Sequence, residues 1–244
     1  MARILLTIRY DGTAYHGWQV QPNAVTVQQV MQDAVERITG VRSGLTGCSR
    51  TDAGVHARMF CCAMDSETPL RGEKLCAALN AVLPRDVAVT EAREVEEAFH
   101  PRYDAKGKRY VYQILNARQR DPFLEGYAWH IKYPLDTALM DRAAKDLLGT
   151  HDFAALCASG SSVEDTVRTV SHAAVERQGD LVLFSVEADG FLYNMVRIMA
   201  GTLVDMASGR IAPDAFPSVL ESGDRHLAGQ TAPACGLFLQ AVRY

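Results

Sequence analysis

One short segment, residues 47–57 with the sequence GCSRTDAGVHA, holds several groups that could do chemistry. Asp52 lies two residues after Arg50 and six before Arg58. Because guanidinium groups hold a nearby carboxyl group in its ionised form, Asp52 is predicted to be charged. An ionised carboxylate can act as a nucleophile or as a general base. Loop aspartates also commonly end turns and form surface ion pairs, so the segment alone leaves both interpretations open.

Other catalytic interpretations of this segment are weaker. Cys48 and His56 could form a thiol–imidazole pair, but no local signature of a cysteine protease surrounds Cys48. The order TDAG reverses the motif of aspartic proteases, and no second copy supplies a partner carboxylate. The phosphate-binding pattern GxxxxGK[ST] is absent. A glycosidase-like pair of carboxylates stays open, since the second carboxylate could come from elsewhere in the chain.

A second candidate is Arg197, the one charged residue in FLYNMVRIMAGTLV, residues 191–204. Both faces of a helix with this sequence would be largely apolar, so much of it should be buried. An arginine in such a helix requires a partner, and Asp52 is a candidate for the facing carboxylate. Alternatively, the side chain reaches the surface along its aliphatic stem.

A third candidate is the basic segment at residues 101–120, with six lysines and arginines against one aspartate in a chain of net charge −4. Alternation along its central strand places Lys108, Tyr110 and Tyr112 on one face and Arg109 on the other. Cations interleaved with tyrosines suit an RNA backbone with stacked bases. The same pattern is also typical of an ordinary solvated strand.

Periodicity predicts the elements that carry these residues. Strands are expected within residues 2–12, 58–66, 86–95, 106–116 and 236–242, and two more within 166–190. Helices are expected from Thr26 to Gly40, at 72–83, 136–148 and 191–208, and a short one after Pro213. This pattern indicates an α/β fold of the α+β type, with mostly antiparallel sheet flanked by helices. The expected halves are 1–120, with the aspartate loop and the tyrosine strand, and 121–244, with the arginine helix.

Composition narrows the class of protein. The 244 residues are 48% hydrophobic and 22% charged, as in globular proteins. The apolar run from Ile4 to Leu6 is too short for a signal peptide or a membrane span, so a cytoplasmic protein without a membrane anchor is expected. The six cysteines include no CxxC pair, and the seven histidines show no HExxH spacing. No metal site is therefore expected.

Five motifs together resemble the tRNA pseudouridine synthase A (TruA) family. They are, in family order, YDGTAYHGWQVQ (10–21), RTDAGVHA (50–57), KRYVYQI (108–114), GFLYNMVRIMAGTLV (190–204) and TAPACGLFL (231–239). The resemblance implies the pseudouridine synthase fold, with two similar halves around a cleft. It also implies a homodimer that isomerises uridine to pseudouridine at positions 38–40 of the tRNA anticodon stem-loop.

Roles follow from the resemblance, position by position. Asp52 would be the catalytic carboxylate, Arg197 its ion-pair partner and Tyr110 the residue that stacks on the target base. Further substrate contacts are expected from the surrounding cations, Arg50, Arg58, Lys106, Lys108 and Arg109. The reaction needs no metal and no cofactor, in agreement with the absence of their motifs. A non-catalytic RNA-binding module and a hydrolase that uses Asp52 remain the rival functions.

Overall fold

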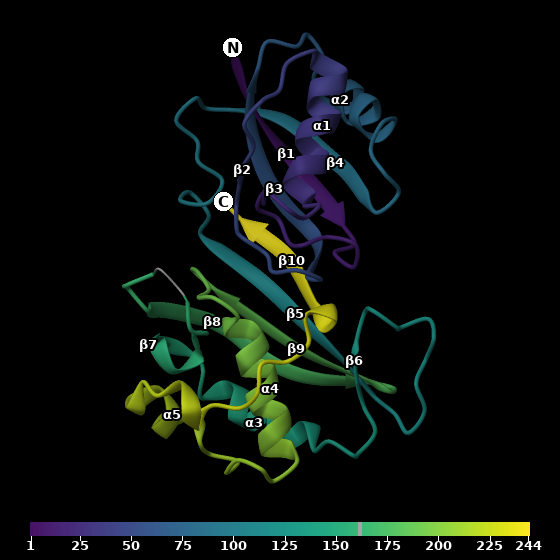
Figure 1. Cartoon of the computed structure of the whole chain (residues 1–244). Coiled ribbons are helices and arrows are strands. Elements are labelled where there is room, and N and C mark those ends of the chain that lie inside the picture. Colours follow the sequence, from purple (N-terminus) through teal and green to yellow (C-terminus); the bar gives the residue numbers. More distant parts are fainter. Residues whose placement is uncertain (161–162) are drawn as a thin grey trace. The chain divides into compact units, whose positions relative to one another are not determined.

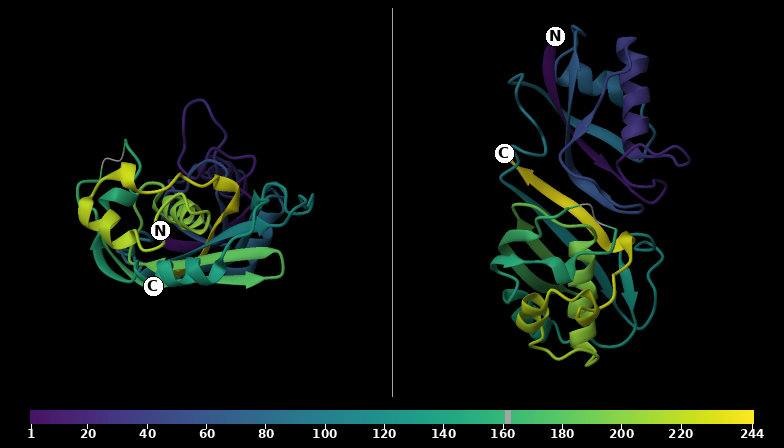
Figure 2. Two further views of the ribbon diagram at one scale, coloured as in Figure 1. Left: turned by 90° about the horizontal axis from the view of Figure 1, so that it is seen from below. Right: turned by 60° about the vertical axis from the view of Figure 1, so that its left-hand side comes forward.

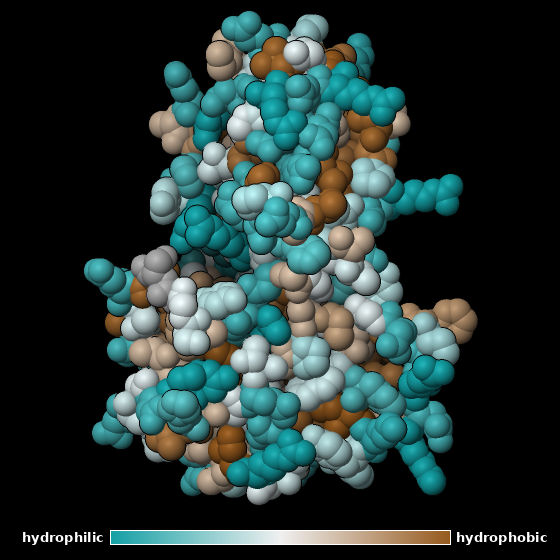
Figure 3. Space-filling model, in the orientation of Figure 1, coloured by the Kyte–Doolittle hydropathy of each residue, from teal (hydrophilic) through white to brown (hydrophobic). Residues whose placement is uncertain are grey.

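The structure is a computed structural model that describes residues 1–160 and 163–244. Helices and strands are mixed along the chain (Figure 1), which confirms the predicted α/β class. The chain forms two compact units, Met1–Lys106 with Phe238–Tyr244, and Gly107–Leu237. The face drawn in Figure 3 is mostly hydrophilic, with hydrophobic residues scattered over it. Among the helices described, none is both long enough and apolar enough to span a membrane.

The first unit contains a sheet in the order β4-β1-β3-β10. β1 is antiparallel to both β3 and β4, while β10 is parallel to β3. The helices α1 and α2 lie on one face of this sheet (Figure 2). The elements are β1 (Ala2–Tyr10), α1 (Val27–Thr39), β2 (Thr46–Gly47), β3 (His56–Ser66), α2 (Gly72–Asn80), β4 (Val87–Val95) and β10 (Leu237–Arg243).

The second unit contains an antiparallel sheet in the order β5-β9-β8-β7, to which β6 adds in parallel beside β5. The turn between β8 and β9 falls at Gly179, as predicted, with φ 62°. The elements are β5 (Gly107–Asn116), β6 (Trp129–Ile131), α3 (Thr137–Lys145), β7 (Gly149–Asp152), β8 (Val167–Gln178), β9 (Leu181–Ala188), α4 (Met195–Ala207) and α5 (Phe216–Ser222).

The units divide the chain at a different place from the expected halves, 1–120 and 121–244. β5 belongs to the second unit because it pairs with β9 from Lys108 to Leu115. The last strand returns to the first unit, where Phe238 and Leu239 pair with the start of β3. The tyrosine strand therefore lies in the same unit as the arginine helix, and not with the aspartate loop.

Helix α1 forms where the sequence predicts it. The Thr26 hydroxyl accepts a hydrogen bond from the amide of Gln29 at 3.3 Å, which caps the first turn. Gly40 ends the helix in the left-handed conformation, with φ 74°. The apolar stripe that includes Met31 and Val35 is buried, so the helix is held by packing as well as by its caps.

Helix α4 is buried nearly all round, as its apolar sequence predicts. It begins at Met195 rather than at Phe191. Asn194 precedes it in the left-handed conformation (φ 59°), which no other non-glycine residue of the described chain adopts. This turn separates Phe191 from the helix and directs the first helical residues into the core.

Replacing Thr26 tests the cap of α1. Both T26A and T26S remove the buried methyl group, but only T26A removes the hydroxyl. We expect T26A to lower the free energy of unfolding by about 1 kcal/mol more than T26S does. Urea denaturation of the two variants measures the difference, and equal stabilities would show that the cap does not stabilise the helix.

Candidate active site

Asp52 lies in the loop that joins β2 to β3, and hydrogen bonds fix this loop to the segment after β1. The Thr51 carbonyl accepts from the Trp18 amide at 3.2 Å, and the amide of Gly54 donates to the Tyr15 carbonyl at 3.1 Å. The hydroxyls of Tyr10 and Thr51 are 2.9 Å apart. The residues on both sides of Asp52 are therefore bonded to the segment at residues 10–18, which fixes the position of the loop.

Two glycines allow this close approach. A Cβ atom on Gly12 would lie 2.0 Å from the Val55 carbonyl oxygen, and one on Gly17 would lie 2.2 Å from the Thr51 oxygen. Gly17 also has φ 81°, a conformation that favours glycine. The glycines of the YDGTAYHGW motif thus let two loops pack backbone against backbone on either side of Asp52.

The Asp52 side chain is half-buried at the start of a tight turn. The amide of Val55 donates to the Asp52 carbonyl at 3.2 Å, and Gly54 adopts φ 78° inside the turn. Of the two predicted neighbouring cations, Arg50 is exposed, and the Arg58 guanidinium lies 5.3 Å from the centre of the Phe238 ring. The loop thus presents a carboxylate with exposed cations nearby in the sequence.

His56 anchors the end of the same loop, a role that sequence reasoning missed. Its imidazole is 1% exposed and stacks on Phe238 with ring centres 4.6 Å apart. Nδ1 lies 3.0 Å from the Gly12 amide nitrogen and 3.1 Å from an Asp11 carboxylate oxygen. Cys48 has its own contact, since its sulfur accepts from the amide of Cys61 at 3.4 Å. These contacts give His56 a structural partner in the loop after β1 and do not support the thiol–imidazole interpretation.

In the second unit, Arg197 has a fixed orientation. Its Nε donates to the Ala232 carbonyl at 2.8 Å, and one Nη donates to the Asn194 side chain at 2.8 Å. The Ala232 amide in turn donates to the Arg197 carbonyl at 3.0 Å. Backbone and side chain are thus both tied to the segment before β10, so the plane of the guanidinium group is set.

The segment at residues 228–233 is itself fastened along α4. The Gly229 amide donates to the Thr202 hydroxyl at 2.9 Å, and the Gln230 amide donates to the Asp205 carboxylate at 3.1 Å. A Cβ atom on Gly201 would lie 1.8 Å from the Gln230 carbonyl oxygen. Gly201, Thr202 and Asp205 of α4 therefore hold residues 228–233 against the helix, and this segment in turn orients Arg197.

Tyr110 lies on the buried face of β5, together with Lys108 and Tyr112, which confirms the predicted alternation. The Tyr110 ring meets Phe191 edge to face, with centres 5.0 Å apart. The Tyr112 hydroxyl donates to the Pro233 carbonyl at 2.7 Å, and burial raises the pKa of that hydroxyl. Tyr112 therefore has a structural role, while Phe191 fixes the ring of Tyr110.

The basic segment at residues 101–120 does not form one continuous face. Lys106 is exposed and belongs to the first unit, with its amide bonded to the Arg243 carbonyl at 2.8 Å. Arg109 projects from the face of β5 opposite Tyr110, where it pairs with Glu187 at 2.9 Å. Of the predicted cations on β5, only Lys108 shares the face of Tyr110.

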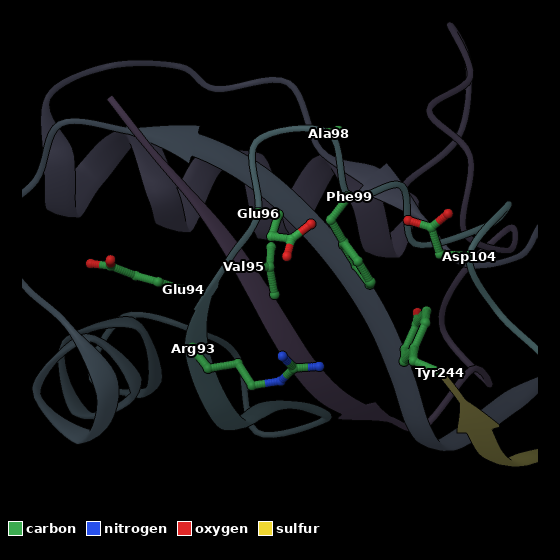
Figure 4. Close-up of a pocket in the computed structure, with 8 residues that line it drawn as sticks. All are labelled: Arg93, Glu94, Val95, Glu96, Ala98, Phe99, Asp104 and Tyr244. Carbon is green, nitrogen blue, oxygen red and sulfur yellow. The ribbon is translucent and has the colours of Figure 1, made fainter.

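The first unit also has an open pocket of about 940 Å³, which Asp52 does not line. The Phe99 and Tyr244 rings are neighbours in it, with centres 5.0 Å apart, and Glu96 and Asp104 lie nearer to them than Glu94 does (Figure 4). Its lining consists of Arg93, Glu94, Val95, Glu96, Ala98, Phe99, Asp104 and Tyr244. Three carboxylates against one guanidinium disfavour a phosphate backbone, so this pocket is a poor candidate for an RNA site. Across residues 1–160 and 163–244, no cluster of three or more histidine, cysteine or acidic side chains is placed to hold a metal ion.

Comparison with known proteins decides the family. Residues 6–104 and 143–244 match the sequence model of the tRNA pseudouridine synthases. The chain belongs to this family. Asp52 and Arg197 both lie within the matched ranges, and Tyr110 lies between them. The family consists of isomerases, and both Asp52 and Arg197 lie in the residues that match its sequence model.

Relatives of the synthase extend over its whole length. The tRNA pseudouridine synthase A of Thermoanaerobacter sp. (strain X514) is 49% identical over 244 residues, which cover 100% of both chains. The enzyme of the same name from Acetivibrio thermocellus is 46% identical over 244 residues, with the same coverage. A chain in the crystal structure of the archaeal box H/ACA sRNP Nop10-Cbf5 complex aligns with 80% of the synthase and 44% of itself, at 16% identity and a TM-score of 0.35.

The candidate residues are divided between the two units of the synthase. Tyr110 and Arg197 belong to the second unit, and Asp52 belongs to the first. The predicted ion pair between Asp52 and Arg197 would join the units, and it stays a prediction.

Replacing Gly17 with alanine tests the loop packing, and G40A is the matched control. Both glycines have positive φ, so each alanine should cost about 1–2 kcal/mol in backbone strain. Only at Gly17 does the added methyl group meet backbone, because nothing lies within 4 Å of the position at Gly40. We therefore expect G17A alone to lower turnover, by about 100-fold, through displacement of Asp52. Pseudouridine formation at saturating tRNA measures this effect, and equal turnover of G17A and G40A would contradict it.

Proposed function

We propose that the chain isomerises uridine to pseudouridine at positions 38–40 of the tRNA anticodon stem-loop, with Asp52 as the catalytic carboxylate. The observation that carries the proposal is the placement of Asp52. It lies in the RTDAGVHA motif, inside the part of the chain that matches the family, on a loop fixed by hydrogen bonds at Thr51 and Gly54. Catalysis by one carboxylate requires this kind of fixed position.

The chemistry explains why a single carboxylate with binding groups is enough. The bond between C1′ and N1 of the uracil breaks, the base turns, and C1′ bonds to C5. The proton on C5 leaves and N1 gains one, so atoms and charge balance without a redox step or an added group. A carboxylate can start this sequence by attacking the sugar or the base, or by removing a proton from the sugar.

Arg197 suits the role of partner to this carboxylate. A guanidinium group has five N–H donors in one plane, in a fork that matches a carboxylate. Contacts with Ala232 and Asn194 fix the direction in which this fork points. An aspartate paired in this way stays ionised and keeps its orientation.

Tyr110 suits the role of a stacking platform for the target base. The base must leave its stack, which costs a few kcal/mol that contacts in the site have to offset. The edge-to-face contact with Phe191 holds the Tyr110 ring, so little side-chain entropy is lost when a base binds. We assign phosphate contacts to the exposed cations Arg50, Arg58 and Lys106 and to Lys108, which shares the Tyr110 face of β5.

Arg109 is the weakest of the proposed substrate contacts, because its guanidinium is already paired with Glu187. A homodimer, which the resemblance implies, and a cytoplasmic location, expected from the short apolar run at Ile4 to Leu6, complete the proposal.

The Asp52→Asn variant tests the catalytic role. Tritium release from unmodified tRNA labelled as [5-³H]uridine reports the loss of the C5 proton. We expect Asp52→Asn to reduce release by at least about 100-fold while tRNA binding persists. Asp33→Asn is the control, since Asp33 is an exposed aspartate of α1 paired with Arg42. Binding without release by the unaltered protein would favour an RNA-binding module, and a free base among the products would favour a hydrolase.

The Tyr110→Phe variant tests whether the hydroxyl takes part in removing the C5 proton late in the reaction. The aromatic ring is retained, so tRNA affinity should not change. Single-turnover tritium release should become slower by about 100-fold if the hydroxyl assists this step. Undiminished release would restrict Tyr110 to stacking.

A further inference from the structure

The connection between β5 and β6 presents an aromatic ring and two cations to solvent. Phe123 is 90% exposed, the largest exposure of any aromatic residue described. Arg118 and Arg120 are exposed as well. Within residues 1–160 and 163–244, neither arginine has an ion pair or a side-chain hydrogen bond, so both charges are available to a partner.

Local hydrogen bonds fix the turn that carries Phe123. The Asp121 carboxylate accepts from the Phe123 amide at 2.9 Å, and its carbonyl accepts from the Leu124 amide at 3.1 Å. At the other end of the connection, Nε2 of His130 lies 2.9 Å from the Ala117 carbonyl oxygen, next to the pairing of β6 with β5. An ordered turn therefore holds the ring out in water, where its face is open to a stacking partner.

The chemistry of these three side chains fits RNA. An exposed ring offers a stacking surface to any unstacked base, and nearby arginines bind phosphates. Phenylalanine and arginine are also enriched in protein–protein interfaces, and it is the two arginines without an ion pair among the described residues that favour a polyanionic partner. The Asp121 carboxylate accepts from the Phe123 amide, and within the described residues neither it nor the exposed Glu125 forms an ion pair with Arg118 or Arg120.

The position along β5 separates this surface from the reacting base. Tyr110 and Asn116 are six residues apart on one strand, which corresponds to roughly 20 Å at about 3.3 Å per residue. Arg118 and Phe123 follow that end of the strand in the sequence, in the connection to β6. An RNA bound to Tyr110 would therefore meet the connection with a different part of its structure.

We propose that residues 118–123 form a second tRNA contact, in which Phe123 stacks on an unstacked base and Arg118 and Arg120 bind phosphates. The inference rests on the proposed function, and it adds a binding surface away from the catalytic loop. This contact raises affinity for the whole tRNA and leaves the chemical step unchanged.

Substitution of Phe123 separates stacking from simple apolar burial. Phe123→Leu keeps an apolar side chain without a π face, whereas Phe123→Trp enlarges the face. Loss of one stacked base should raise Kd and KM for tRNA in Phe123→Leu by about 5- to 100-fold, with kcat unchanged. Phe123→Trp should bind as tightly as the unaltered protein. Because the Phe123 side chain is exposed, both variants should fold as the unaltered protein does, and thermal unfolding checks this.

The arginines are tested by the salt dependence of binding. Replacing both Arg118 and Arg120 with glutamine should reduce the slope of log K against log [salt] by about 1 for each phosphate that the protein no longer binds. Arg142→Gln is the control, because Arg142 is an exposed arginine of α3 in the same unit. It should leave the slope unchanged.

Comparing the binding of full tRNA with the binding of an isolated anticodon stem-loop shows which part of the RNA meets residues 118–123. Phe123→Leu should weaken binding of the full tRNA and not of the stem-loop. Equal affinities of Phe123→Leu and the unaltered protein for full tRNA would overturn the proposal. A change confined to oligomeric state would overturn it in favour of a protein interface. If the unaltered protein binds tRNA and makes no pseudouridine, the proposed function fails, while the binding comparison still decides this contact.

Discussion

The packing of two loops backbone against backbone, at Gly12 and Gly17, is the constraint on which the position of Asp52 depends. Carbonyl oxygens of Thr51 and Val55 occupy the space where side chains would otherwise stand. The loop that carries Asp52 is therefore determined by residues about 40 positions earlier. A carboxylate on such a loop loses little freedom when a substrate arrives, which is the condition for efficient positioning.

The second unit positions Arg197 by a similar combination of glycine packing and hydrogen bonds. Arg197 lies on a buried helix, and its guanidinium is oriented by a carbonyl of the segment at residues 228–233. Thr202 and Asp205 of α4 hold that segment by hydrogen bonds, and Gly201 leaves room for its backbone. In both units, then, glycines allow close contact and hydrogen bonds hold it, which positions the segments that carry Asp52 and Arg197.

The sequence predicts those features whose causes are local. Helix α1 and strand β5 have long periodic patterns, and their predicted faces are the buried faces. Strands β2, β6 and β7 have two to four residues each, too few for a pattern to emerge. The role of His56 was missed because its partner Gly12 is 44 positions away. The late start of α4 depends on the left-handed turn at Asn194, which residue type alone does not specify.

The return of β10 to the first unit has a consequence for biosynthesis. Residues 1–106 leave the ribosome first, but the edge of β3 at His56 and Ala57 acquires its partner only after residues 107–237 have been made. Until then this edge exposes unpaired backbone groups that another chain could pair with. His56 directly follows the loop of Asp52, and its ring stacks on Phe238 of the late strand. The loop that carries Asp52 is thus synthesised well before the strand that completes its surroundings.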